Sequence, residues 1–262
     1  MLPEAPSFSL VGKVVVQCGG TGILGRSLAA GLAASGARLV LASRDRAKIE
    51  EQIAVLRAAD YAAYAEQVDL TDETSIPGLR DRILGDHGRI DGLVYNAVAR
   101  PMRSMSDHLE TWKDSMAVNA TGFFAVVRML GDALAQGGGG SIVNIASIQG
   151  MIGMNPWLYE GTNMSTAPDY FFHKGGMINI TRYLASHYGP RKVRVNAVSP
   201  GGIYNPDKPQ PEAFLERYNK MTMLGRMAEA REITGAVVYL LSDASTYVTG
   251  ANLVIDGGYT AK

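Results

Sequence analysis

A glycine-rich loop between a short apolar run and a helical pattern limits the possible folds of this chain more than any other feature. Residues 13–17 (Lys-Val-Val-Val-Gln) predict a buried strand, and Cys18-Gly-Gly-Thr-Gly-Ile-Leu-Gly25 follows directly. The apolar residues of 26–34 recur at helical spacing. A strand, a glycine loop and a helix start in this order surround a pyrophosphate with backbone N–H groups and the positive end of a helix dipole. The stretch therefore predicts a nucleotide-binding βα unit.

The glycine spacing is not decisive by itself. Gly20, Gly22 and Gly25 satisfy the G-x-G-x-x-G pattern, but a glycine-rich turn also ends strands for purely geometric reasons. The strand before the loop and the helix after it favour the nucleotide site over the plain turn.

Strand and helix patterns alternate through the rest of the chain. Strands are predicted at 38–42, 62–68, 91–95, 141–146, 194–198 and 251–256, and helices at 46–58, up to about His87, at about 106–135 and at 169–188. With the first strand this makes seven, and composition does not change along the chain. We therefore expect an α/β fold: a single Rossmann-type doubly wound parallel seven-stranded sheet flanked by helices, over residues 1–262.

Charge and cysteine content narrow the class of protein. Lys+Arg and Asp+Glu both number 25, so no basic field favours nucleic acid or an anionic membrane as a partner. A single cysteine, Cys18, excludes an internal disulfide and fits a reducing compartment. The sequence predicts no signal peptide, no apolar stretch as long as a membrane span, and no metal site among its four scattered histidines. We expect a cytoplasmic protein.

The tip of the second predicted strand bears on the choice of cofactor. Ser43 and Arg44 come first and Asp45 one place later, where it is placed to cap the next helix. In dinucleotide-binding proteins an acidic residue here bonds the ribose hydroxyls, whereas an arginine accommodates a 2′-phosphate. The order of residues favours NADP, with NAD possible.

Tyr170 and Lys174 are four residues apart on a predicted helix, so their side chains lie on one face. An ammonium close to a phenol lowers its pKa by about 1–3 units, which brings proton transfer within reach near neutral pH. Ser147, at the end of strand 141–146, is expected to bond the same substrate oxygen. The spacing alone is also that of any surface helix. Inside helix 106–135, Asn119 and Gly122 are poor helix formers, which indicates a helix that opens there.

Together these motifs resemble the short-chain dehydrogenase/reductase family over nearly the whole chain. The segments that carry the resemblance are the glycine loop 18–25, Tyr95-Asn96-Ala97-Val98, Asn119, Ser147, Tyr170 with Lys174, Ser199-Pro200-Gly201, and Val254-Ile-Asp-Gly-Gly. The resemblance implies a catalytic tetrad of Asn119, Ser147, Tyr170 and Lys174. Tyr170 would transfer the proton and Ser147 would hold the substrate carbonyl. Lys174 would bind the nicotinamide ribose and lower the tyrosine pKa, while Asn119 would hold a water that links the lysine to solvent.

The resemblance also implies a cofactor site for NADP, or alternatively NAD, and a small-molecule substrate. Its cofactor-binding residues are Gly19, Thr21, Gly22, Ile23, Leu24, Gly25, Ser43, Arg44, Asp69, Leu70, Asn96, Ala97, Tyr170, Lys174, Pro200, Gly201 and Ile203. Three positions depart from the family pattern: Cys18 replaces a threonine, Ile23 a glycine and Val98 a glycine. The threonine usual after Pro200-Gly201 is also missing, and Tyr204 stands in that region.

A homo-oligomer, tetramer or dimer, is implied as well, built on helices 106–135 and 169–188 and the last strand. The apolar residues of helix 169–188 cover more of its surface than a single stripe facing the core requires. They include Phe171, Phe172, Met177 and Ile178.

Two segments are expected to shape the substrate site. Residues 204–223 carry three prolines and a short helix, and predict a lid that closes over the substrate. Between Ser147 and Tyr170 the chain is longer than is usual in the family, with an insertion at about 155–168. Its aromatic, amide and hydroxyl side chains suit a polyhydroxylated substrate; the alternative is a loop that packs on a neighbouring subunit. The expected substrate residues are Arg100, Gln149, Tyr159, Asn163 and Tyr204.

These features favour an NADP-dependent oxidoreductase that acts on a hydroxyl or ketone of a polar, sugar-like molecule. One alternative is a 3-oxoacyl-thioester reductase of the acyl carrier protein type, and another is a dinucleotide-binding sensor without catalysis. Residues 159–164 (Tyr-Glu-Gly-Thr-Asn-Met) and Leu224-Gly-Arg-Met resemble more closely the oxidoreductases of flagellin glycosylation, which act in legionaminic-acid-type sugar pathways.

Overall fold

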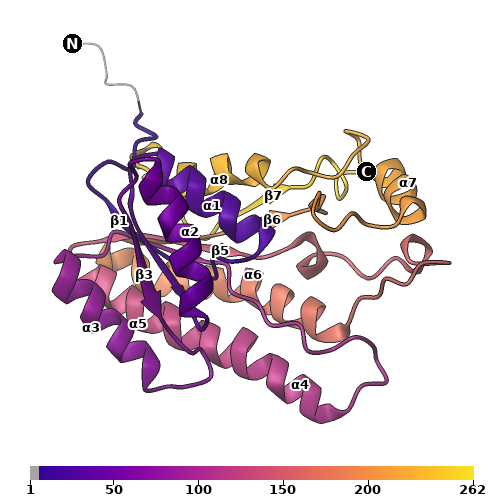
Figure 1. Ribbon diagram of the computed structural model, residues 1–262, viewed down its shortest axis with the longest axis horizontal. Helices are drawn as coiled ribbons and strands as arrows, with labels where there is room; N and C mark the ends of the chain where they lie inside the picture. The colour runs from indigo at the N-terminus through magenta and orange to yellow at the C-terminus, as the bar shows by residue number, and fades with distance from the viewer. Residues whose placement is uncertain (1–5) are drawn as a thin grey trace.

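Seven parallel strands form the centre of the structure, in the order β3-β2-β1-β4-β5-β6-β7 (Figure 1). The computed structural model describes residues 6–262, so the first residues of the N-terminal segment, for which no signal peptide is predicted, lie outside the described part. The strands are β1 Val14–Cys18, β2 Arg38–Ser43, β3 Ala63–Gln67, β4 Gly92–Tyr95, β5 Gly140–Ile145, β6 Val193–Pro200 and β7 Asn252–Ile255. The predicted doubly wound α/β sheet is confirmed.

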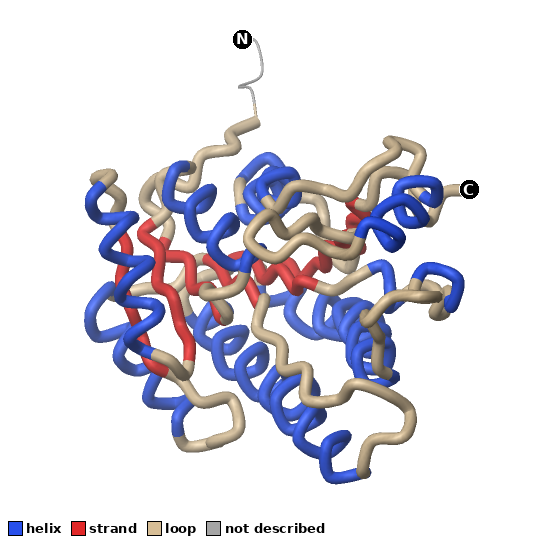
Figure 2. The backbone as a smooth tube through the Cα atoms, turned by 45° about the vertical axis from the view of Figure 1, so that its right-hand side comes forward, coloured by secondary structure: helices blue, strands red, loops and turns tan. Residues whose placement is uncertain are grey.

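Helices cover both faces of this sheet (Figures 1 and 2). The helices are α1 Ile23–Ala34, α2 Arg46–Ala58, α3 Ser75–His87, α4 Leu109–Met116, α5 Phe123–Gln136, α6 Pro168–Tyr188, α7 Glu212–Met221 and α8 Arg231–Leu241. Apolar residues of α1, α2 and α8 join one buried cluster, and those of α3, α5 and α6 join another. Each parallel strand is thus covered on both sides, which explains why its sequence is a nearly continuous apolar run.

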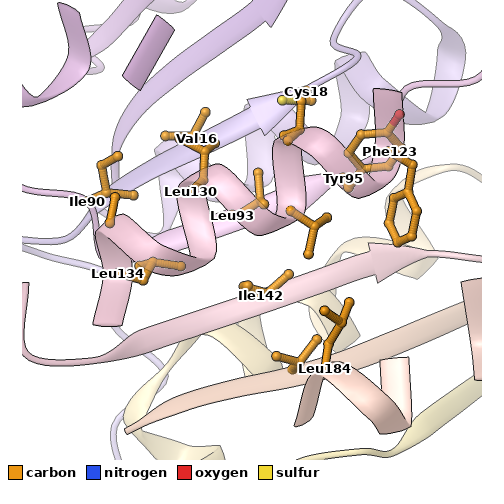
Figure 3. Close-up of a cluster of buried hydrophobic side chains, with 14 of the residues drawn as sticks. Val16, Cys18, Ile90, Leu93, Tyr95, Phe123, Leu130, Leu134, Ile142 and Leu184 are labelled. Atoms are coloured by element: carbon orange, nitrogen blue, oxygen red, sulfur yellow. The ribbon is translucent and has the colours of Figure 1, made fainter. Parts of the chain in front are cut away.

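Strand β1 shows how the alternation of side chains divides the core. Val14, Val16 and Cys18 point into the cluster under α3, α5 and α6, while Val15 points into the opposite cluster. In the first cluster Tyr95 at the end of β4 meets Phe123 of α5, with ring centroids 4.9 Å apart (Figure 3). A one-residue shift of β1 would reverse these contacts, so burial on both faces specifies the register with β2 and β4.

The long helix predicted at 106–135 begins later and is divided. It starts at Leu109, because Asp107 accepts hydrogen bonds from Arg103 and Ser104 and holds a turn there. Between α4 and α5 it opens into a π-helical turn, Ala117–Gly122, at the expected interruption. Asp45 caps α2 as predicted, with its side chain accepting from Lys48 N.

The prediction that no apolar stretch is as long as a membrane span is wrong. The combined helix Leu109–Gln136 is long and apolar enough to cross a membrane, with a mean hydropathy of 1.2 over its most apolar window. Half of that window is buried inside the protein, because the apolar face of α5, including Val127 and Leu130, packs on the sheet. Length and composition alone therefore do not distinguish this core helix from a membrane span.

Candidate active site

A cavity of about 550 Å³ lies where the carboxyl ends of the central strands meet the loops that follow them. The strand order reverses between β1 and β4, and ligands of open α/β sheets bind at such a switch point. The cavity is lined by Gly22 after β1, Asn96 after β4, Ser147 after β5 and Gly201 after β6, and by Tyr170 and Lys174 of α6. The topology thus brings together motifs that are far apart in the sequence.

The glycine loop after β1 is held rigidly from two sides. The Gln17 side chain donates to Gly25 O at 2.8 Å, and Asn96 Nδ2 donates to Gly19 O at 2.7 Å. Gly19 has φ +86°, and a Cβ there would lie 2.5 Å from Ala97 N. At Gly25 a Cβ would lie 2.6 Å from Gly19 O. Both positions require glycine, because no side chain fits between these backbone segments.

Gly22 differs, since a Cβ added there would meet no protein atom within 4 Å. Gly22 is the N-cap of α1 and has ordinary extended backbone angles. It lines the cavity at the positive end of the α1 dipole, which is where a pyrophosphate binds in this type of unit. The free space over Gly22 therefore fits a dinucleotide whose phosphates approach the backbone closely.

Alanine substitutions at these glycines should separate folding from cofactor binding. Gly22→Ala should leave the melting temperature unchanged and weaken cofactor binding about tenfold or more, because its methyl group occupies space that only the pyrophosphate would use. Gly25→Ala should lower the melting temperature, since its Cβ meets backbone. Calorimetry with NADP⁺ and NADPH and thermal unfolding give both quantities. Unchanged cofactor affinity in Gly22→Ala would contradict this placement.

Lys174 is buried under Tyr170 on α6. It is 3% exposed, its Nζ donates to Ile145 O at 2.5 Å, and Nζ lies 5.7 Å from the centroid of the Tyr170 ring. Burial, with a smaller contribution from the Arg100 charge, lowers the pKa of Lys174 to about 7. Ser147 lies at the end of β5, is also buried, and accepts a hydrogen bond from Gln149 N at 3.2 Å.

Asn119 sits in the π-helical turn and is 3% exposed. Its side chain bonds both backbone groups of one residue: Ala99 N donates to Oδ1 at 2.9 Å, and Nδ2 donates to Ala99 O at 2.7 Å. Nδ2 also donates to Ser115 Oγ at 3.0 Å, and Ser115 in turn donates to Asp169 Oδ2 at 2.5 Å. Asn119 thus joins the loop after β4 to the start of α6.

Sequence reasoning missed Ser115 and Asp169. Both are buried, and Asp169 immediately precedes Tyr170. The available signals were the spacing of four between Ser115 and Asn119, which places them on one helix face, and an acid in the first turn of α6. Neither signal shows that the two side chains meet, because they come from different helices.

His173 lies beside Tyr170 on α6, with ring centroids 5.2 Å apart and nearly perpendicular planes. It is 4% exposed, and burial lowers its pKa to about 3. The imidazole is therefore neutral at physiological pH. It does not line the cavity, whereas Tyr170, Ser147 and Lys174 do.

The predicted cofactor residues divide into two groups. Those that line the cavity are Gly22, Ile23, Leu24, Gly25, Asn96, Tyr170, Lys174, Pro200, Gly201 and Ile203. Gly19, Thr21, Ser43, Arg44, Asp69, Leu70 and Ala97 lie outside its lining, at and beside the ends of β1 to β4. In this second group Arg44 is exposed, and hydrogen bonds from Thr71 lower the pKa of the Asp69 carboxyl.

The insertion at 155–168 packs on the predicted lid within the same chain. Arg217 of α7 donates to the backbone oxygens of Trp157 and Glu160. Tyr159 contacts Phe214 of α7, with ring centroids 5.6 Å apart. These contacts hold the insertion against α7 within one chain, and the alternative of packing on a neighbouring subunit stays a prediction.

Three of the five expected substrate residues line the cavity: Arg100, Gln149 and Tyr159. Asn163 is exposed and lies outside the cavity lining, as does Tyr204, whose neighbour Asn205 lines it instead. These two assignments are corrected. Asn163 follows the hydrogen-bonded turn formed by Tyr159 and Thr162 and is exposed, whereas Met164 directly after it lines the cavity.

This arrangement suits transfer of a hydride and a proton to or from one substrate oxygen-bearing carbon. A nicotinamide bound beside Asn96, Ile203 and Lys174 would supply the hydride acceptor or donor. In that reaction Tyr170 would accept the hydroxyl proton during alcohol oxidation and return it during ketone reduction. The Ser147 hydroxyl would donate to the same substrate oxygen.

Comparisons with known proteins agree with this chemistry. A family model described as enoyl-(acyl carrier protein) reductase matches residues 21–260. D-threitol dehydrogenase of Mycolicibacterium smegmatis is 32% identical and covers 97% of this chain and 95% of that protein. Galactitol 2-dehydrogenase (L-tagatose-forming) of Cereibacter sphaeroides is 34% identical and covers 97% of each.

Among solved structures, a gluconate 5-dehydrogenase from Burkholderia cenocepacia in complex with NADP and tartrate has a TM-score of 0.88 and 27% identity, covering 97% of this chain and 98% of that one. These matches extend over nearly the full length of the chain. The chain belongs to the short-chain dehydrogenase/reductase family and is an NAD(P)-dependent oxidoreductase.

Proposed function

We propose that the protein interconverts a secondary hydroxyl and a ketone on a polyhydroxylated, sugar-like substrate, with NADP(H) as cofactor. The observation that carries this proposal is the set of polar side chains that line the cavity near Tyr170 and Lys174. Gln149, Tyr159, Ser165 and Thr166 line the same cavity as Tyr170. Their amide and hydroxyl groups can bond several substrate hydroxyls at once. The dehydrogenases of threitol and galactitol among the relatives support this class.

The activity is tested by following the absorbance of the reduced nicotinamide. The enzyme is mixed with NADP⁺ and a panel of polyols and sugar acids, and in the reverse direction with NADPH and either ketoses or 3-oxoacyl thioesters. We expect turnover of a polyol, sugar acid or ketose. Efficient reduction of a thioester with none of the sugar-like compounds would instead favour the acyl carrier protein type of reductase. Cofactor binding without any turnover would favour the sensor.

The preference for NADP rests on Ser43 and Arg44 at the end of β2, where Arg44 is exposed. The NADP bound in the gluconate 5-dehydrogenase crystal supports it. Ser43→Asp combined with Arg44→Ile should shift the ratio of kcat/KM for NADP⁺ over NAD⁺ by about tenfold to a hundredfold toward NAD⁺. The double change removes a guanidinium and adds a carboxylate that repels the 2′-phosphate.

Arg46→Ile is the matched control, because Arg46 lies on the exposed side of α2 in a pair with Glu50. It should leave the cofactor ratio unchanged. A wild-type enzyme that already prefers NAD⁺ would refute the assignment and give the ribose-binding role to Asp45.

We also propose a homo-oligomer built on α4, α5 and α6. Met177 and Ile178 are buried in the core and Phe171 lines the cavity, so the predicted surplus of apolar surface on α6 is limited to Phe172. Phe172 is 59% exposed and contacts Trp112 of α4. Leu109 and Phe124 on the neighbouring helices are also exposed. Exposed apolar side chains of this size on α4, α5 and α6 are of a kind found at protein interfaces.

Light scattering at micromolar concentration should give a mass of two or four chains. Phe172→Glu should reduce that mass, whereas Val55→Glu on α2, also exposed, should not. A monomeric wild-type protein would contradict the proposal.

The role of this protein in a pathway is a finer part of the proposal. The segment Tyr159–Met164 and the residues 224–227 resemble oxidoreductases of flagellin glycosylation, and such a pathway would place the enzyme in the cytoplasm. The buried thiol of Cys18 is compatible with that compartment. Purified enzyme and sugar intermediates of that pathway, assayed as above, test the assignment.

A further inference from the structure

Arg100 is a cation of the cavity that has no acidic partner among residues 6–262. It lies in the loop between β4 and α4 and lines the cavity. Its Cζ lies 4.1 Å from the centroid of the Tyr170 ring. By contrast, Arg82 and Arg89 are each paired with a carboxylate. A guanidinium over a ring face leaves its N–H donors for a ligand, because the face contact uses none of them.

The backbone next to Arg100 is fixed. Asn119 bonds both the N–H and the carbonyl of Ala99, and the Ser115 and Asp169 side chains extend that network to the residue before Tyr170. The loop is therefore joined to the same helix that carries the catalytic tyrosine. Arg100 is exposed, but this anchored backbone places its guanidinium over the Tyr170 ring at the cavity.

The charges of the cavity favour an anion. Arg100 and Arg103 contribute guanidinium groups to its lining, and among residues 6–262 the only acidic side chain in the lining is Asp169. The Asp169 carboxylate already accepts the Ser115 hydroxyl. An arginine in such a partly enclosed site binds carboxylate or phosphate oxygens through two parallel hydrogen bonds.

We propose that Arg100 is a specificity-determining residue that binds an anionic group of the substrate, a carboxylate or a phosphate ester, away from the reacting carbon. The inference rests on the proposed function and narrows its substrate class from neutral polyols to polyhydroxylated acids or sugar phosphates. The guanidinium holds the anion while Tyr170 and Ser147 contact the reacting oxygen. Two fixed contacts of this kind orient the carbon that exchanges the hydride.

Matched probes test the proposal by binding, independently of turnover. D-glucitol, D-gluconate and D-glucitol 6-phosphate share a six-carbon chain and differ in the presence and kind of anion. Calorimetric titration into the NADPH-bound enzyme should show that at least one anionic probe binds about tenfold or more tightly than D-glucitol. Arg100→Gln should remove that preference, and Arg100→Lys should retain part of it.

Arg182→Gln is the control, because Arg182 is exposed on α6 and lies outside the cavity lining. It should preserve the preference; loss in Arg182→Gln, or retention of the preference in Arg100→Gln, would overturn the proposal. A preference for D-gluconate alone assigns a carboxylate, and a preference for D-glucitol 6-phosphate alone assigns a phosphate ester. Equal affinity for all three probes, including no measurable binding of any, would overturn it.

Kinetics with any probe that turns over distinguishes substrate binding from an effect on Tyr170. In Arg100→Gln we expect KM for the anionic probe to rise about tenfold or more with kcat changed less. An equal fall in kcat on neutral and anionic probes would place the role of Arg100 in the chemistry and overturn the proposal. Efficient turnover of D-glucitol without any anion preference would leave the proposed function standing and reject only this inference.

Discussion

Tyr170→Phe is expected to lower kcat by about 10²–10⁴-fold, because it removes the one proton that the mechanism transfers at the substrate oxygen. The ring stays in place, so the Arg100 contact and the packing against His173 should be kept. Cofactor affinity and melting temperature should therefore change little. Steady-state kinetics with a turned-over substrate and calorimetry with NADPH measure these quantities.

Tyr183→Phe is the matched control, since Tyr183 lies on the same helix and is 66% exposed. It should behave as wild type. If Tyr170→Phe retains a tenth or more of the wild-type kcat, another group supplies the proton and the assignment of the general acid–base is wrong. The neutral His173 ring, outside the cavity lining, is a poor candidate for that role.

Lys174→Met is expected to reduce kcat about 10²-fold or more and to weaken cofactor binding about tenfold or more, because the lysine serves both the catalytic group and the cofactor ribose. Methionine keeps a similar length without the charge, and the hydrogen bond to Ile145 O is lost. Kinetics and NADPH calorimetry test both effects. Wild-type cofactor affinity would refute the assigned contact with the ribose.

Lys174→Met also tests how the free energy of unfolding depends on pH. Lys174 has a folded-state pKa of about 7, below the 10.5 of an exposed lysine. Between these values the unfolded chain binds more protons than the folded one, so the free energy of unfolding rises with pH. From pH 7 to 9 the cofactor-free wild type should gain about 2 kcal/mol relative to Lys174→Met.

Comparing wild type with the variant at each pH removes the contribution of Cys18, whose pKa is raised to about 12 by burial. Urea denaturation at pH 7, 8 and 9 provides the free energies of unfolding. The same pH dependence in both proteins would show that the buried amine stays protonated in the folded state.

Local features of the sequence predicted the fold and marked Tyr170 and Lys174 as a candidate catalytic pair. The apolar runs at β1 to β7 specify buried parallel strands because both faces of each strand are covered. Gly25 belongs to a local glycine pattern, because a Cβ there would meet the backbone of Gly19 and Gly20 in the same loop. The spacing of Tyr170 and Lys174 follows from one helical turn. Each of these constraints acts over a few residues, so it leaves a pattern that can be seen in the chain.

Contacts between distant segments were decided only by the tertiary structure. The bonds from Asn119 to Ala99, and from Ser115 to Asp169, join residues 20 and 54 positions apart, and no periodicity records such a meeting. They place Arg100 over the Tyr170 ring.

Asn163 and Tyr159 lie in one insertion with similar polar character, yet a single turn exposes the first and places the second in the cavity. The apolar helix Leu109–Gln136 likewise could not be identified as a core element until the sheet that buries half of its most apolar window was known. Side-chain type limits which chemistry a residue can perform. The three-dimensional packing of remote segments decides which residues perform it together, because burial and distance depend on the whole fold.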